Sequence, residues 1–219
     1  MFLAAVTVAA VSFTSCTGEA KGGDEEGVIE FATRAMDPSH PLYGFAPDAA
    51  TLRFKKDRFS IEMSTMGMFN YAIIGNNRDR TLAQTVKFMN IKQACIERGN
   101  EINEDNSEYA LSIEETGETK EIIGLTCYRL KVSKLNEPNV KFDAWYTKEL
   151  GMEDCNKLTP YSKVKGILLD YRIKKMGIEM HFLARSYSPT KVPDHIFKIP
   201  ATMKIISKEE MEQFFAELQ

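Results

Sequence analysis

Methionine sulfur is one of the few groups in this sequence whose type and spacing suggest a binding chemistry. Met63, Met66 and Met68 lie within the stretch "MSTMGMF", and closely spaced thioethers are soft ligands that suit Cu(I). Met63, however, falls on the same side of an alternating pattern as Phe59 and Ile61, as a residue that fills an apolar core does. We therefore expect these methionines to pack, with copper handling as the minor alternative, and we predict no metal site and no cofactor.

The sequence lacks the common motifs of catalytic and nucleotide-binding sites. No G-x-S-x-G, H-E-x-x-H, C-x-x-C or P-loop pattern occurs, and His40, His181 and His195 are far apart in the chain. His181 shares one side of a predicted strand with Glu179 and Arg185, which is more typical of a solvated polar face than of an acid–base site. We predict that the protein is not an enzyme and assign no catalytic residue.

Three cysteines fall in the part of the chain that is expected to fold. Cys95, Cys127 and Cys155 allow one disulfide in three pairings and leave one thiol over, so the pairing stays open. No histidine is near Cys127 in the sequence, so it is expected to be a packed strand cysteine or half of a disulfide rather than a nucleophile.

The fourth cysteine, Cys16, lies where the sequence changes from apolar to small and charged. Residues 2–13, "FLAAVTVAAVSF", have the length of a signal-peptide core and are too short to span a bilayer of roughly 30 Å. Small residues precede Cys16, and the following "TGEAKGGDEEG" is too polar to bury a core. We interpret residues 1–15 as a signal peptide and residues 16–27 as a lipidated tether; the alternative is an ordinary thiol in a leader.

The residues around Cys16 resemble the lipobox of bacterial lipoproteins, where the cysteine marks the cleavage point and carries the lipid. The resemblance implies that Cys16 is lipidated and attaches the protein to a membrane as an outer membrane lipoprotein of the cell envelope. A lysine followed by acidic residues in the tether loosely resembles the surface-export signal of Bacteroides-type lipoproteins. Display on the periplasmic face and on the cell surface both remain open.

Residues 28–219 are enough for one domain of ordinary size. The formal net charge of −3 gives no sign of a basic patch, so no nucleic-acid partner is expected. Alternating apolar and polar residues, as in "TLRFKKDRFSIEMST", predict strands with one buried face. The same alternation recurs around residues 69–73, 82–88, 109–113, 128–132, 140–146, 169–173 and 178–182, and short turn sequences between them favour antiparallel neighbours.

Helix patterns are scarce in this sequence. In "SKEEMEQFFAELQ", Ser207 and Glu210 form a capping-box pattern, and apolar residues recur at helical spacing up to Leu218. The stretch "IKQACIERGNEINED", residues 91–105, could hold a helical turn or two. The prediction is therefore a mainly β fold, an antiparallel sheet with a C-terminal amphipathic helix and few other helices.

From about residue 118, the segments "ETKEIIGLTCYRLKV", "FDAWYTKEL", "TPYSKVKGILLDYR" and "FKIPATMKIIS" resemble an uncharacterised group of Bacteroides-type secreted lipoproteins related to GLPGLI domains of unknown function. Those domains in turn resemble the half-barrel of the LolA/LolB lipoprotein carriers. The resemblance implies a curved antiparallel sheet, an incomplete barrel whose concave side takes acyl chains. It brings no catalytic residue with it.

One terminal helix is too narrow to cover the whole apolar face of such a sheet, so we predict a hollow that holds a lipid or another apolar ligand. The alternative is an envelope scaffold that binds another envelope protein and fills its interior with its own side chains. The connection of residues 37–50 is the candidate lid, through Leu42, Tyr43 and Phe45, and Phe214 and Phe215 are expected to close one end. The candidate ligand-binding wall consists of Phe54, Ile61, Tyr71, Leu130, Phe142 and Tyr171.

Replacing Cys16 tests the predicted anchor. Cys16→Ala should leave an unlipidated precursor or a soluble product, because the acyl acceptor is gone, whereas the parent protein should partition into the detergent phase. Incorporation of radiolabelled palmitate and detergent phase separation measure this directly. Equal palmitate incorporation into both proteins would show that the lipobox interpretation is wrong.

Overall fold

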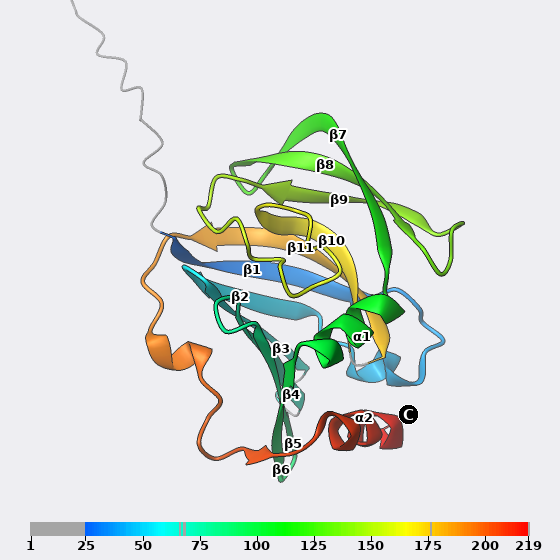
Figure 1. Cartoon of the computed structure of the whole chain (residues 1–219), viewed down its shortest axis with the longest axis vertical. Coiled ribbons are helices and arrows are strands. Elements are labelled where there is room, and N and C mark those ends of the chain that lie inside the picture. The colour runs from blue at the N-terminus through cyan, green and yellow to red at the C-terminus, as the bar shows by residue number, and fades with distance from the viewer. Residues whose placement is uncertain (1–24, 66, 68, 176, 219) are drawn as a thin grey trace, which may run out of the picture.

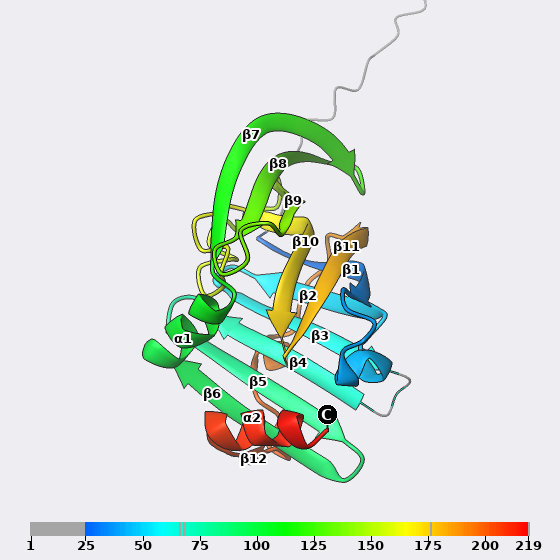
Figure 2. The ribbon, with the colours of Figure 1, turned by 90° about the vertical axis from the view of Figure 1, so that its right-hand side faces the viewer.

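A single sheet of 12 strands organises the part of the chain that the structure, a computed structural model, describes: residues 25–65, 67, 69–175 and 177–218. The sheet curves strongly and does not close into a barrel (Figures 1 and 2). The predicted mainly β fold, the curved antiparallel sheet and the C-terminal helix are therefore confirmed. No helix among the described residues has the length and apolar character needed to cross a bilayer.

Two antiparallel meanders make up the sheet. The first contains β1 (Glu26–Ala35), β2 (Ala49–Lys55), β3 (Arg58–Thr65), β4 (Phe69–Asn76), β5 (Thr81–Phe88) and β6 (Ile91–Arg98), and the second contains β7 (Leu111–Ile122), β8 (Leu125–Lys134), β9 (Lys141–Thr147), β10 (Ile167–Lys175) and β11 (Ile178–Ser188). Pairing of β1 with β11 joins them in the middle of the sheet. Strand β1 begins at Glu26, one residue before the expected end of the tether at residue 27, and Glu26 pairs with Lys55.

The two outer strands of these meanders, β6 and β7, are neighbours in sequence but lie on opposite sides of the opening. Helix α1 (Asn100–Glu108) connects them, and the short strand β12 (Lys204–Ile205) pairs in parallel with β6. Residues 91–98, where a helical turn was considered, are strand β6; the helix begins only after Gly99, whose φ of 50° suits glycine. A strand is favoured over a helix here because Ala94 and Cys95, which lie on opposite faces of β6, are both buried.

The segment of residues 148–166, between β9 and β10, packs its apolar side chains into the same core as the inward face of the sheet. Asn77, in the β4–β5 turn, donates a hydrogen bond to the Asp154 carbonyl at 2.7 Å, which fixes the segment to the first meander. Its buried apolar residues are Leu150, Met152, Cys155, Leu158, Tyr161 and Val164. The segment therefore fills one end of the half-barrel with the chain's own side chains.

Helix α2 (Lys208–Glu217) and the short 3-10 helix η1 (Pro41–Phe45) cover the other end. The predicted capping box is present, because Ser207 accepts from the Glu210 amide at 3.1 Å and Glu210 accepts from the Ser207 amide at 2.8 Å. Phe215 lies edge-on to Tyr71, with ring centroids 5.8 Å apart, so α2 lays its apolar side on β4. Figure 2 shows α2 lying across β5 and β6.

The outer face of the first meander is covered as well. Residues 189–203 run across it and include the 3-10 helix η2 (Asp194–Phe197). Val192 and Phe197 form a second small core there with Ile74 and Ala83. This packing explains why Ile74 of β4 and Ala83 of β5 are buried on the outer face of the sheet.

Gly166 is a position where the fold requires glycine. Its φ is +136°, and a Cβ would lie far inside contact distance of the Thr147 carbonyl oxygen on β9. Gly166→Ala should therefore lower the free energy of unfolding by at least about 1–3 kcal/mol, the cost of a strained backbone conformation. Urea denaturation measures it, with Gly44→Ala as control because a Cβ at Gly44 meets nothing within 4 Å. Equal effects of the two substitutions would contradict this account of the β9–β10 connection.

Candidate functional site

The residues predicted as the ligand-binding wall all belong to one continuous core. Each is at most 9% exposed: Phe54, Ile61, Tyr71, Leu130, Phe142 and Tyr171. Ile61 and Tyr171 line the apolar cavity that remains inside the half-barrel, whereas Tyr71 lies under α2. The sequence therefore identified core positions, of which two face internal space.

The remaining apolar cavity is small. It measures about 70 Å³ and is lined by residues of β2 to β5, of β10 and β11, and by Cys155 to Thr159 of the 148–166 segment. A dry cavity of about 150 Å³ is the size that takes up benzene. A long acyl chain therefore does not fit while the segment holds its position.

Hydrogen bonds from buried polar groups hold the 148–166 segment. The Asn156 amide donates to the Val164 carbonyl at 3.1 Å and to the Gly166 carbonyl at 2.7 Å, and its side chain is buried. The Tyr161 hydroxyl donates to the Arg172 carbonyl on β10 at 2.6 Å. Each buried donor left unpaired would cost about 1–3 kcal/mol, so the Asn156 bonds stabilise the fold of the segment itself and the Tyr161 bond attaches the segment to β10.

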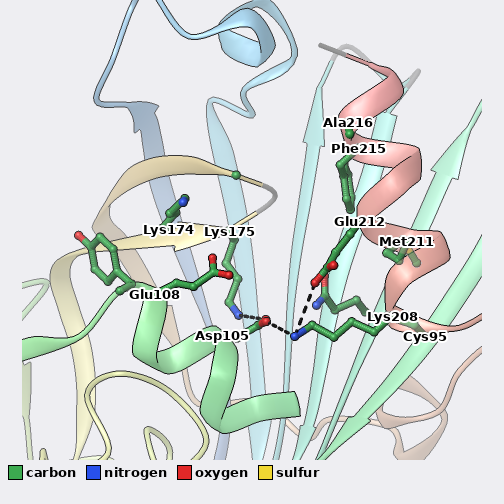
Figure 3. A pocket seen from close by; sticks show the side chains of 13 residues that line it. Cys95, Asp105, Glu108, Lys174, Lys175, Lys208, Met211, Glu212, Phe215 and Ala216 are labelled. Carbon is green, nitrogen blue, oxygen red and sulfur yellow. Dashed lines mark ion pairs between the residues drawn. The ribbon is translucent and has the colours of Figure 1, made fainter. Parts of the chain in front are cut away.

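A second, polar cavity of about 270 Å³ opens between α1, α2 and the end of β10. Figure 3 shows Asp105 of α1 between two ammonium groups, Lys208 of α2 and Lys175 of β10. The Lys208 Nζ is 2.6 Å from Asp105, and Lys208 also approaches Glu212 at 3.6 Å. This ion-pair network connects α1 and α2 across the open side of the half-barrel.

Among the described residues, Lys175 alone lines both the apolar and the polar cavity. Its Nζ is 3.8 Å from Asp105, a looser contact than the 2.6 Å between Asp105 and Lys208. The Lys175 side chain is only 14% exposed. A second anionic partner would therefore interact with its ammonium group more strongly than in water, because the site is partly desolvated. The geometry can therefore accommodate a small ligand with an apolar part and an anionic head.

A buried carboxyl group, Glu97, lies on the same inward face. It is fully buried, shares a hydrogen bond with Gln84, and its Oε2 has no hydrogen-bond partner among the described residues. Burial, and then the negative charge of Asp105, raise the pKa of Glu97, while Lys175 and Lys208 oppose the shift. Gln84 in turn accepts a hydrogen bond from the Tyr71 hydroxyl.

The cysteines of the folded part are all free and buried. Burial raises the pKa of Cys127 to about 11 and those of Cys95 and Cys155 to about 12, so these thiols are held in the unreactive protonated form. Met63 is buried in the core, whereas Met66, Met68 and Cys16 lie outside the described residues. Within the described ranges, no group of three or more His, Cys, Asp or Glu side chains is placed to hold a metal ion.

The candidate lid residues differ in their environments. Leu42 is buried, while Tyr43 is 46% exposed and Phe45 is 37% exposed. Leu42 and Phe45 border a gap of about 10 Å³ beside Phe215. The larger cover over the inward face comes from the 148–166 segment, which the sequence did not indicate.

The polar groups near His181 are arranged differently from the sequence-based expectation. His181 Nε2 lies 2.7 Å from Asp170 on the neighbouring strand, and Asp170 also pairs with Lys120 at 3.2 Å. Glu179 instead pairs with Lys134 and accepts from the Tyr109 hydroxyl at 2.9 Å. Neither pair could be read from the sequence, because the first depends on the register of β10 and β11 and the second joins β8 to β11, which are not neighbours in the sheet.

The network around Lys175 was also missed. Its members come from β6, α1, β10 and α2, and the sequence gives no signal that joins those elements. The position of Glu97 could have been inferred in part. It lies two residues from Cys95, so the two share one face of the strand once residues 91–98 are known to be a strand.

Comparison with known proteins bears on the fold alone. No protein-family model and no curated protein matches the chain. Among solved structures, the chain is similar to PNGF-II, with a TM-score of 0.51 and 13% sequence identity. The match covers 86% of this chain and 32% of the PNGF-II chain, so this chain spans about a third of that protein's length.

Glu97→Gln tests the buried carboxyl. The pKa of Glu97 is higher in the folded protein than its ordinary value of 4.5. The contribution of Glu97 to stability is therefore complete below pH 4.5 and is lost as the pH rises through the pKa of the folded state. The variant should therefore gain stability relative to the parent as the pH rises from about 4.5, measured by urea denaturation across pH. Glu104→Gln, on the exposed side of α1, is the control. A pH-independent difference for Glu97→Gln would contradict the raised pKa.

Proposed function

We propose that the protein is a non-enzymatic lipoprotein of the cell envelope that binds a small amphipathic ligand at the open side of its half-barrel. Cys16 carries the lipid and residues 17–25 connect it to β1. The signal-like segment and the small residues before Cys16 support the anchor.

The position of Lys175 carries the ligand-binding part of the proposal. A ligand seated at Lys175 places its head in the polar cavity of about 270 Å³ and its apolar end toward the cavity of about 70 Å³. An anionic head pairs with the Lys175 ammonium group, which Asp105 holds only loosely. The ligand class is therefore a small carboxylate with a short apolar chain.

The size of the apolar cavity limits the ligand. A long acyl chain of the kind that the LolA/LolB carriers take would have to displace the 148–166 segment and break the bonds of Tyr161 to Arg172 and of Asn77 to Asp154. Displacement would also expose buried side chains such as Leu158 and Tyr161, at roughly 25 cal/mol per Å² of apolar surface. Short ligands avoid that cost.

An envelope scaffold without a ligand is the second candidate function. The filled interior favours it, because the 148–166 segment, η1 and α2 already cover most of the inward face. On this alternative, the outer surface of the protein binds another envelope protein.

Titration with hexanoate and hexanol, followed by calorimetry, separates the two candidates. We expect hexanoate to bind and hexanol to bind more weakly, and Lys175→Met should weaken hexanoate binding about tenfold by removing the charged partner. Lys163→Met is the matched control, since Lys163 is an exposed lysine that lines neither cavity. An equal loss of hexanoate affinity in both variants would contradict the role of Lys175. If neither probe binds, the ligand-binding proposal is wrong and the scaffold function stands.

A further inference from the structure

Exposed apolar side chains gather at the end of the sheet where η1 and the β5–β6 hairpin lie. Six large hydrophobic residues are exposed among those described, and four are here: Tyr43 (46% exposed), Phe45 (37%), Met89 (81%) and Ile91 (37%). The Phe45 and Phe88 rings are 6.2 Å apart, which places η1 against the hairpin. We call these four residues, with Phe88, the apolar end.

Two lysines flank this apolar end on the hairpin. Lys87 and Lys92 are register partners on β5 and β6, directly before Phe88 and after Ile91. Both are exposed, and neither forms an ion pair with any described residue. An apolar tip between unpaired ammonium groups complements a bilayer surface, where side chains enter the interface and lysines meet anionic headgroups.

We propose that the apolar end docks on the surface of an anionic lipid bilayer. Met89 and Asn90 form the hairpin turn, so Met89 enters the interface first, and the aromatic rings of Tyr43 and Phe45 follow at the headgroup level. Lys87 and Lys92 contact the headgroups, each contributing about a fivefold factor to affinity. Figure 2 shows η1 and the β5–β6 hairpin on one side of the molecule.

The position of the chain start is compatible with this docking. Glu26 pairs with Lys55 at the opposite end of the strands, and β1 extends over about 33 Å. The nine residues 17–25 lie between Cys16 and Glu26, and the ten steps from Cys16 to Glu26 have a maximum reach of about 35 Å. A lipid at Cys16 and the apolar end can therefore reach one bilayer together, although the docking itself does not depend on the lipid.

A polarity-sensitive nitrobenzoxadiazole label provides a local test in the full chain carrying Cys16→Ala, which has no lipid. Met89→Cys and, as control, Leu135→Cys each receive the label; Leu135 is 57% exposed in the β8–β9 connection, and the native thiols of the fold are buried. With vesicles of phosphatidylcholine and phosphatidylglycerol, emission should rise severalfold and shift to the blue at position 89 only.

The charge requirement is tested with the same label. Lys87→Gln or Lys92→Gln should weaken vesicle affinity about fivefold, and Lys163→Gln, an exposed lysine of the 148–166 segment, should not. Unchanged emission at position 89 with vesicles, or equal changes at positions 89 and 135, would overturn the proposal. Emission at position 89 that depends on protein concentration and not on vesicles would overturn it in favour of a second copy of the chain.

Discussion

The structure depends on one constraint: a sheet with an apolar inward face that does not close into a barrel has to cover that face in another way. Pairing of β1 with β11 joins the two meanders into one curved surface, which leaves β6 and β7 apart across the opening. The 148–166 segment covers one end of that surface, and α2 with η1 covers the other. Buried side chains such as Tyr161 and Phe215 replace the contacts that a closed barrel would supply.

The ion-pair network of Asp105, Lys175 and Lys208 forms where α1, α2 and the end of β10 come together. Helix α1 must cross the opening because it connects the outer strands, and α2 lies over β6, so Asp105 and Lys208 come within 2.6 Å. The end of β10 brings Lys175 to the same place. Glu97 is buried beneath this network, where desolvation raises its pKa and the lysines limit the shift. The proposed ligand site is thus a region where apolar and ionised side chains meet inside the half-barrel.

Local patterns predicted strands in the regions of β2 to β5 and β7 to β11, and the terminal helix, because alternation and capping are set by near neighbours in sequence. They did not predict β1, β6 or β12. The pairs Phe54 with Phe59 and Met63 with Tyr71 occupy adjacent strands in the predicted antiparallel order. The 148–166 segment was not foreseen, since its apolar residues follow no helical or strand period and are buried only by distant strands. The site around Lys175 was missed for the same physical reason: Asp105, Lys175 and Lys208 meet through tertiary packing, and none of them stands out in the sequence.

The central claim is that the 148–166 segment is part of the core and keeps the inward face closed in solution. Native-state hydrogen exchange of the purified protein, followed by mass spectrometry, tests it most directly. Amides bonded within the segment, such as Gly166 N–H to the Glu153 carbonyl and Val164 N–H to the Tyr161 carbonyl, should exchange as slowly as those of β3 and β4. Rapid exchange in residues 150–166 while β3 and β4 stay protected would contradict the account, because the half-barrel would then be open.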